Sequence, residues 1–144
     1  MTDRLLIQNL TSLVALRNTQ LEKLQAAQAE KQATAERYKK NLDRLHSLAV
    51  NSGASGSLPI ALAANCGNYK QAVLAMADSH RLDLTMHEAD MAVSQKALNQ
   101  AYVKCEVLGQ VLEKNKQALA HKGAVQERKV HDDMATQVWL RSQN

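Results

Sequence analysis

The sequence predicts an all-α fold: a two-helix antiparallel coiled-coil hairpin with a longer, overhanging C-terminal helix. Three observations predict it. Residues that suit a helix seam recur at alternating gaps of three and four in both halves of the chain. A single Gly- and Ser-rich stretch separates the halves. The composition has no Phe, one Trp and one Pro, and its Ala, Leu, Gln, Lys and Glu favour a narrow seam between helices over a globular core.

The first helix is expected over residues 3–50. Thr2 or Asp3 can cap its first turn. Gly53 and Gly56 interrupt the pattern, so a turn is expected over residues 51–58. The expected seam positions of this helix are Leu6, Leu10, Leu13, Arg17, Gln20, Leu24, Gln28, Lys31, Ala35, Tyr38, Leu42 and Leu45.

The second helix is expected over residues 59–140, because Pro59 suits a first helical turn. Gly67 is the expected place for a kink or local break. Together the helices would form one hairpin over residues 1–144. The expected seam positions of the second helix are Leu84, His87, Met91, Ser94, Leu98, Ala101, Cys105, Leu108, Leu112, Asn115 and Leu119.

The sequence also predicts a register for the two helices. Pairing facing positions symmetrically about the Gly/Ser stretch places Tyr38 opposite Val73 and Leu24 opposite His87. Several seam positions are polar, which weakens a coiled coil while fixing its register. These positions are Arg17, Gln20, Gln28, Lys31, His80 and Ser94.

This register predicts a C-terminal overhang. Thr2 would lie near Gly109, and the second helix would continue for roughly 30 residues, or about 45 Å. Val130, Met134 and Val138 recur near helical spacing there, which is typical of an interaction surface. A frayed tail beyond residue 137 is the alternative.

No arrangement of residues indicates catalysis or metal binding. His80 and His87 are two helical turns apart, too far for paired ligands, and the adjacent Asp132 and Asp133 lie on different faces of a helix. Cys66 and Cys105 are too few for a disulfide framework and are expected to be reduced. We therefore expect a protein without catalytic residues, cofactor, metal or small-molecule substrate.

The charge pattern argues against nucleic acid as a partner. The net charge is +4, but opposite charges are interspersed, and the basic pair at 39–40 has no interleaved aromatic residues. Nucleic acid is therefore not an expected partner. The N-terminus lacks a secretory signal, and no stretch reaches the roughly 20 apolar residues of a membrane span. We expect a cytoplasmic protein.

Two segments resemble motifs of a known family. One is Asn-Tyr-Lys-Gln at 68–71, and the other is Gln-Glu-Arg-Lys-Val-His-Asp-Asp-Met-Ala at 126–135. They resemble motifs of the flagellar FliJ family of type III export proteins, and the length and two-helix layout are similar as well. Ala72, Val73 and Met134 stand at or near places where family members carry aromatic residues.

The resemblance implies a non-enzymatic stalk that binds the hexameric export ATPase and links it to the membrane export gate. It also implies contact with export chaperones and a peripheral location at the inner membrane. By this analogy the gate-facing residues are Leu42, Leu45, Asn68, Tyr69, Gln71, Met76 and His80. The ATPase-facing residues are Lys116, Lys122, Arg128, Lys129, Val130, Asp132, Asp133 and Met134.

Two other functions stay open at this point. A generic scaffold or chaperone could dimerise through the overhangs into a four-helix bundle. A basic helical adaptor could bind a membrane or nucleic acid surface.

Overall fold

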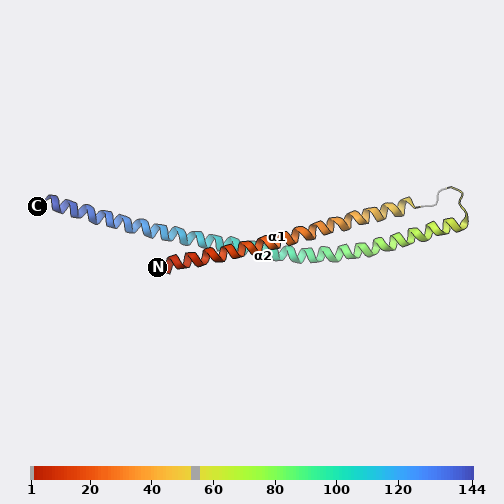
Figure 1. Cartoon of the computed structure of the whole chain (residues 1–144), viewed down its shortest axis with the longest axis horizontal. Coiled ribbons are helices and arrows are strands. Elements are labelled where there is room, and N and C mark those ends of the chain that lie inside the picture. Colours follow the sequence, from red (N-terminus) through yellow and green to blue (C-terminus); the bar gives the residue numbers. More distant parts are fainter. Residues whose placement is uncertain (1, 53–55) are drawn as a thin grey trace. The chain divides into compact units, whose positions relative to one another are not determined.

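The computed structural model describes residues 2–52 and 56–144. These residues form two long α-helices, α1 (Thr2–Asn51) and α2 (Ile60–Ser142), and contain no strand (Figure 1). The Pro59 carbonyl accepts hydrogen bonds from the backbone N–H groups of Leu62 and Ala63, as expected of a proline at the start of a helix. The predicted all-α two-helix hairpin is confirmed. Part of the predicted turn, residues 53–55, lies outside the described residues.

The chain divides into two compact units, and each contains a piece of both helices. One unit holds Met1–Leu21 and Gln100–Asn144, and the other holds Glu22–Asn99. Few side chains in either unit are fully buried, because two helices can cover only a narrow strip of each other. The buried ones are small or aliphatic: Ala35, Ala49, Val73, Ala77 and Leu112.

The seam of α1 follows the predicted pattern only in part. From Gln28 to Leu45 the predicted positions are buried or half-buried. Nearer the N-terminus Leu10 is half-buried as predicted, but three positions were wrong by one residue, since Ile7, Val14 and Leu21 are half-buried in place of their neighbours. The predicted seam residues that are exposed are Leu6, Leu13, Arg17, Gln20 and Leu24. The sequence has two neighbouring stripes here, Leu6–Leu13–Gln20 and Ile7–Val14–Leu21. The second forms the seam, which avoids burying the amide of Gln20.

The register in the unit Glu22–Asn99 differs from the predicted one. The ring of Tyr38 packs against His80 and His87, with centroids 5.7 and 5.8 Å away, and does not lie opposite Val73. The helices are therefore displaced by about ten residues, or three helical turns, from the predicted pairing. Seam positions recur every three or four residues, so a slip of about three, seven or ten residues again brings seam positions opposite one another, and the repeat alone does not select the register.

This displacement moves the start of α2 past the end of α1. In the observed register Asn51 lies level with the region around Gln71. The first three turns of α2, from Ile60 onward, extend beyond that level, as Figure 1 shows near the connection.

The same register shortens the predicted overhang. In the unit that holds the N-terminus, Lys122 Nζ lies 2.9 Å from Asp3 Oδ2, so the first turn of α1 lies beside Lys122 rather than Gly109. From Lys122 to Ser142, α2 continues for about 20 residues, or about 30 Å. Every residue from 121 to 144 is exposed.

The predicted break at Gly67 is absent. α2 runs without interruption through Gly67, Gly109 and Gly123 to Ser142. A single Gly costs a helix only about 1 kcal/mol relative to Ala, and the neighbouring turns are rich in Ala, Leu and Gln. Those strong helix formers offset the cost of each glycine.

Candidate partner-binding surfaces

A polar cluster joins the two helices in the middle of the seam. Lys31 Nζ forms an ion pair with Asp90 Oδ2 at 2.8 Å and donates a hydrogen bond to Ser94 Oγ. The Nε2–H of His87 donates to the backbone carbonyl of Lys31 at 2.8 Å. Gln28 Nε2 donates to the carbonyl of Met91 at 3.3 Å. The polar groups of this cluster bind one another. They therefore hold the register of the two helices and do not form a ligand site.

Among the described residues, two carboxylates have a pKa that a lysine across the seam lowers. The hydrogen bond and the charge of Lys122 lower the pKa of Asp3 below its ordinary value of 3.8. Lys31 lowers the pKa of Asp90 in the same way. Both carboxylates are exposed, so each pair has only a small effect on stability.

The residues predicted to face the export gate divide into two groups. Leu42, Leu45 and His80 are half-buried in the seam, so they support the surface rather than form it. The exposed members lie on α2, and a partner can reach them directly. They are Asn68, Tyr69, Gln71 and Met76.

The residues predicted to face the ATPase lie along the last third of α2. Lys116 and Lys122 lie on the part of α2 that runs beside α1, and Lys122 is paired with Asp3. The other members occupy the exposed extension beyond Lys122, which we call the overhang (residues 123–142). They are Arg128, Lys129, Val130, Asp132, Asp133 and Met134.

The overhang carries an apolar stripe that has no partner among residues 2–52 and 56–144. Val130, Met134 and Val138 follow one another at four-residue intervals and are 45%, 59% and 66% exposed, so they share one face of the helix. Trp139 and Leu140 extend the apolar surface and are also exposed. α1 begins beside Lys122, so none of its seam residues reaches the stripe. The overhang therefore presents an interaction surface rather than a continuation of the intramolecular seam.

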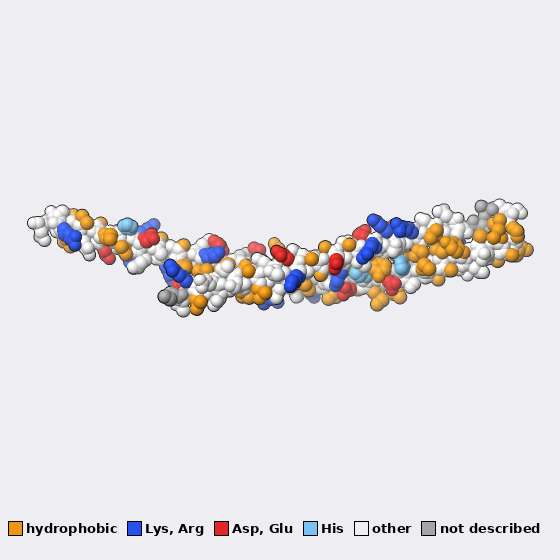
Figure 2. All heavy atoms as spheres, in the orientation of Figure 1, with side chains coloured by type: hydrophobic (Ala, Val, Ile, Leu, Met, Phe, Trp, Pro, Cys, Tyr) orange, Lys and Arg blue, Asp and Glu red, His pale blue; other side chains and the backbone are white. Residues whose placement is uncertain are grey.

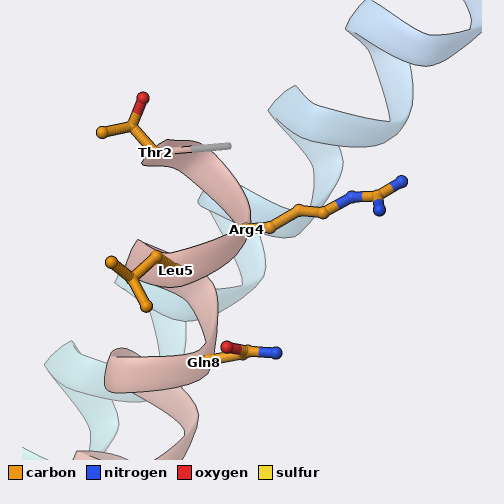
Figure 3. Close-up of a pocket in the computed structure, with 4 residues that line it drawn as sticks. All are labelled: Thr2, Arg4, Leu5 and Gln8. Carbon is orange, nitrogen blue, oxygen red and sulfur yellow. The ribbon is translucent and has the colours of Figure 1, made fainter.

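The start of α1 carries a shallow hollow that does not form a ligand site. Thr2, Arg4, Leu5 and Gln8 line it, and all four come from α1. Figure 3 shows Thr2 and Leu5 projecting to one side of the helix and Arg4 and Gln8 to the other. Their side chains do not converge on a common point, as groups that bind a small molecule must.

The remaining residue groups do not form a metal or ligand site either. Within residues 2–52 and 56–144, no group of three or more His, Cys, Asp or Glu side chains is placed to hold a metal ion. Cys66 and Cys105 are free thiols, and both are half-buried. Neither α1 nor α2 contains a stretch apolar enough to traverse a bilayer.

Sequence reasoning missed a second exposed surface, next to the connection between the helices. Leu48, Val50, Leu58, Ile60 and Leu62 are all exposed there. The signal that could have revealed them is the absence of any Lys, Arg, Asp, Glu or His from residues 47–69. An uncharged stretch of this length is unusual for a solvated helix surface.

These features define a class of protein: a two-helix coiled-coil hairpin with free apolar surfaces near its connection and along its C-terminal extension. The family model of the flagellar FliJ protein matches residues 7–144. The chain therefore belongs to the FliJ family, and the resemblance found in the sequence is confirmed. It is a component of the flagellar type III export apparatus. The comparison with curated protein sequences gave no match, and neither did the comparison with solved structures.

Proposed function

We propose that this chain is a stalk-like link in the flagellar export apparatus. Its overhang binds the hexameric export ATPase, and the surface around Tyr69 and Met76 contacts the cytoplasmic part of the export gate. Export chaperones are further partners. The family membership supports a role in the apparatus, and the two separate exposed surfaces support a protein that bridges partners.

The overhang is the observation that carries the proposal. The overhang is about five helical turns long, and its apolar stripe from Val130 to Val138 spans about two of those turns without cover from α1. Fully burying one of its large apolar side chains in a partner is worth roughly 1.5–3 kcal/mol. Charged residues of both signs, including Arg128 and Asp132, flank the stripe and provide orientation and specificity at a polar rim.

A single asymmetric helix also suits a ring of identical subunits. The overhang presents a different set of side chains in each direction, so each ATPase subunit would meet a different surface. Such differential contacts bias the state of each subunit, which is the energetic requirement for coupling between a stalk and a ring.

The test is a double substitution, Val130→Asp with Met134→Asp, in the full-length chain. It places two charges on the apolar stripe, and we expect co-purification with the export ATPase and stimulation of its activity to fall at least about tenfold. Val93→Asp with Val103→Asp is the matched control, because these valines are also on α2 and are 70% and 58% exposed. Stimulation that survives the overhang substitutions would refute the assigned ATPase-facing surface.

Sedimentation of the purified chain separates this function from the scaffold alternative. The stalk proposal predicts a monomer or a weak associate at micromolar concentration. A dimer that persists on dilution to nanomolar concentration, and that Val130→Asp with Met134→Asp dissociates, would show that the overhang pairs with a second copy instead.

A further inference from the structure

The net charge of the protein is confined to one segment. Between Arg37 and Ala77 the sequence has five basic side chains and one acidic side chain, Asp43, which gives +4. This equals the net charge of the whole chain, so the remaining residues are balanced between basic and acidic side chains. The basic members are Arg37, Lys39, Lys40, Arg44 and Lys70.

Three of these basic residues lie on one face of α1 that leads toward the connection. Arg37, Lys40, Arg44 and Leu48 are separated by gaps of three, four and four, so they line the same side of the helix. All four are exposed. Lys39 lies off this face and is partly neutralised by Glu36 and Glu88, at 3.7 and 4.0 Å.

Beyond the basic face comes a surface that is apolar and uncharged. Ile60 is 89% exposed, Val50 is 70% exposed, and Leu62 is 47% exposed. The register leaves Ile60 and Leu62 on turns of α2 that extend past the end of α1. Figure 2 shows this end with hydrophobic side chains gathered near the connection and a group of blue basic side chains next to them.

We propose that this end of the hairpin, the apolar residues together with the basic face of α1, binds the surface of an anionic phospholipid bilayer. The apolar side chains would enter the boundary between headgroups and acyl chains, and the basic side chains would lie over the negative headgroups. In the protein the apolar residues lie at the end and the basic residues behind them. In a bilayer the apolar acyl chains lie inside and the negative headgroups outside them, so the two arrangements match. The proposal is separate from the link between ATPase and gate, because it requires lipid alone.

The dimensions agree with such a contact if the hairpin approaches obliquely. Arg44 lies about 10 Å along α1 from Asn51, and Lys70 lies about 15 Å along α2 from Ile60. Interfacial helices enter a bilayer by about 5–10 Å, and attraction to the headgroups acts over a Debye length of about 8 Å at physiological salt. An upright hairpin would hold Arg44 too far from the surface, whereas a tilted one brings both basic residues into range.

The experiment measures partition of the full-length chain onto vesicles by flotation. One set of vesicles is phosphatidylcholine alone, and the other mixes it with an equal amount of phosphatidylglycerol. Each basic residue near an anionic surface contributes about 1 kcal/mol, or about fivefold in partition. We therefore expect at least about tenfold stronger partition onto the mixed vesicles, and a loss of that preference in high salt.

Two double variants test the two halves of the surface. Ile60→Asp with Leu62→Asp removes the apolar part, and Lys40→Glu with Arg44→Glu reverses the basic face. Each is expected to lower partition onto the mixed vesicles at least about tenfold, with helix content by circular dichroism unchanged because all four side chains are exposed. The matched control, Val93→Asp with Val103→Asp, is expected to partition like the unaltered chain.

Three results would overturn the proposal. The first is no partition onto the mixed vesicles, and the second is equal partition onto both kinds. The third is partition that the Ile60→Asp and Leu62→Asp substitutions leave unchanged. If those substitutions spare lipid binding but abolish binding to a protein of the export apparatus, the apolar end is a protein-docking site instead.

Discussion

At the scale of single residues, polar side chains in the seam select the register. Lys31 reaches both Asp90 and Ser94, and its carbonyl accepts a hydrogen bond from His87. A slip of one heptad would separate these partners while still matching apolar positions to one another. One buried atom, Gln28 Oε1, has no hydrogen-bond partner among the described residues, so the cluster contributes more to specificity than to stability.

The pair at the start of α1 gives a pH-dependent prediction. Lys122 lowers the pKa of Asp3 in the folded chain. The stabilisation that this pair gives the folded chain is therefore fully present above pH 3.8, the ordinary pKa of an aspartate. It is lost as the pH falls through the lower pKa that Asp3 has in the folded chain. A titration of the Asp3 carboxyl by nuclear magnetic resonance should give a midpoint below 3.8.

Two variants control this measurement. Lys122→Gln should return the pKa of Asp3 toward its ordinary value, because the charge and its hydrogen bond are removed. Lys116→Gln should leave the pKa unchanged, since the hydrogen bond and the lysine charge that lower the pKa of Asp3 come from Lys122. An unchanged pKa in Lys122→Gln would mean that the first turn of α1 does not lie beside Lys122.

At the scale of elements, the long α2 tolerates glycines that nothing in its packing requires. A Cβ atom added at Gly67 or Gly109 would meet no atom within 4 Å beyond the adjoining turns of its own helix backbone and its neighbours in sequence. By contrast Gly56, in the connection, has a φ of +83°, a conformation that side chains with a Cβ rarely adopt.

This contrast predicts opposite effects of the same substitution. Gly109→Ala should raise the free energy of unfolding by about 0.5–1 kcal/mol, because Ala loses less backbone entropy in a helix. Gly56→Ala should lower it by about 1 kcal/mol through backbone strain. Thermal unfolding followed by circular dichroism at 222 nm, an α-helix signal, measures both. A stabilising Gly56→Ala would contradict the left-handed conformation in the connection.

At the scale of the whole molecule, the chain has two parts. In one part α1 and α2 are paired, and in the other, the overhang, α2 continues alone. Contacts between α1 and α2 reach as far as Asp3 and Lys122, and the overhang beyond them is exposed throughout. Stability therefore resides in the paired part, while the free part is available to a partner.

Truncation after Lys122 tests this separation. We expect the midpoint of thermal unfolding to stay nearly unchanged, because every removed residue is exposed in the folded chain. Stimulation of the export ATPase should be lost at the same time. A large fall in the unfolding midpoint would show that the overhang supports the hairpin, and the two roles would then not be separable.

The sequence by itself determined the two-helix fold, its family and the identity of most seam residues. Those properties depend on local features: helix propensity, the seven-residue repeat and the single Gly/Ser-rich break. The motifs at 68–71 and 126–135 were sufficient to indicate the family that the comparison then showed.

Only the tertiary structure decided the register, and with it the length of the overhang and the exposure of the first turns of α2. Seam positions recur every three or four residues along both helices, so the local pattern leaves the stagger open. The contacts that choose one stagger join residues distant in sequence, such as Tyr38 with His80 and His87, and Asp3 with Lys122. Such contacts exist only when both helices are in place.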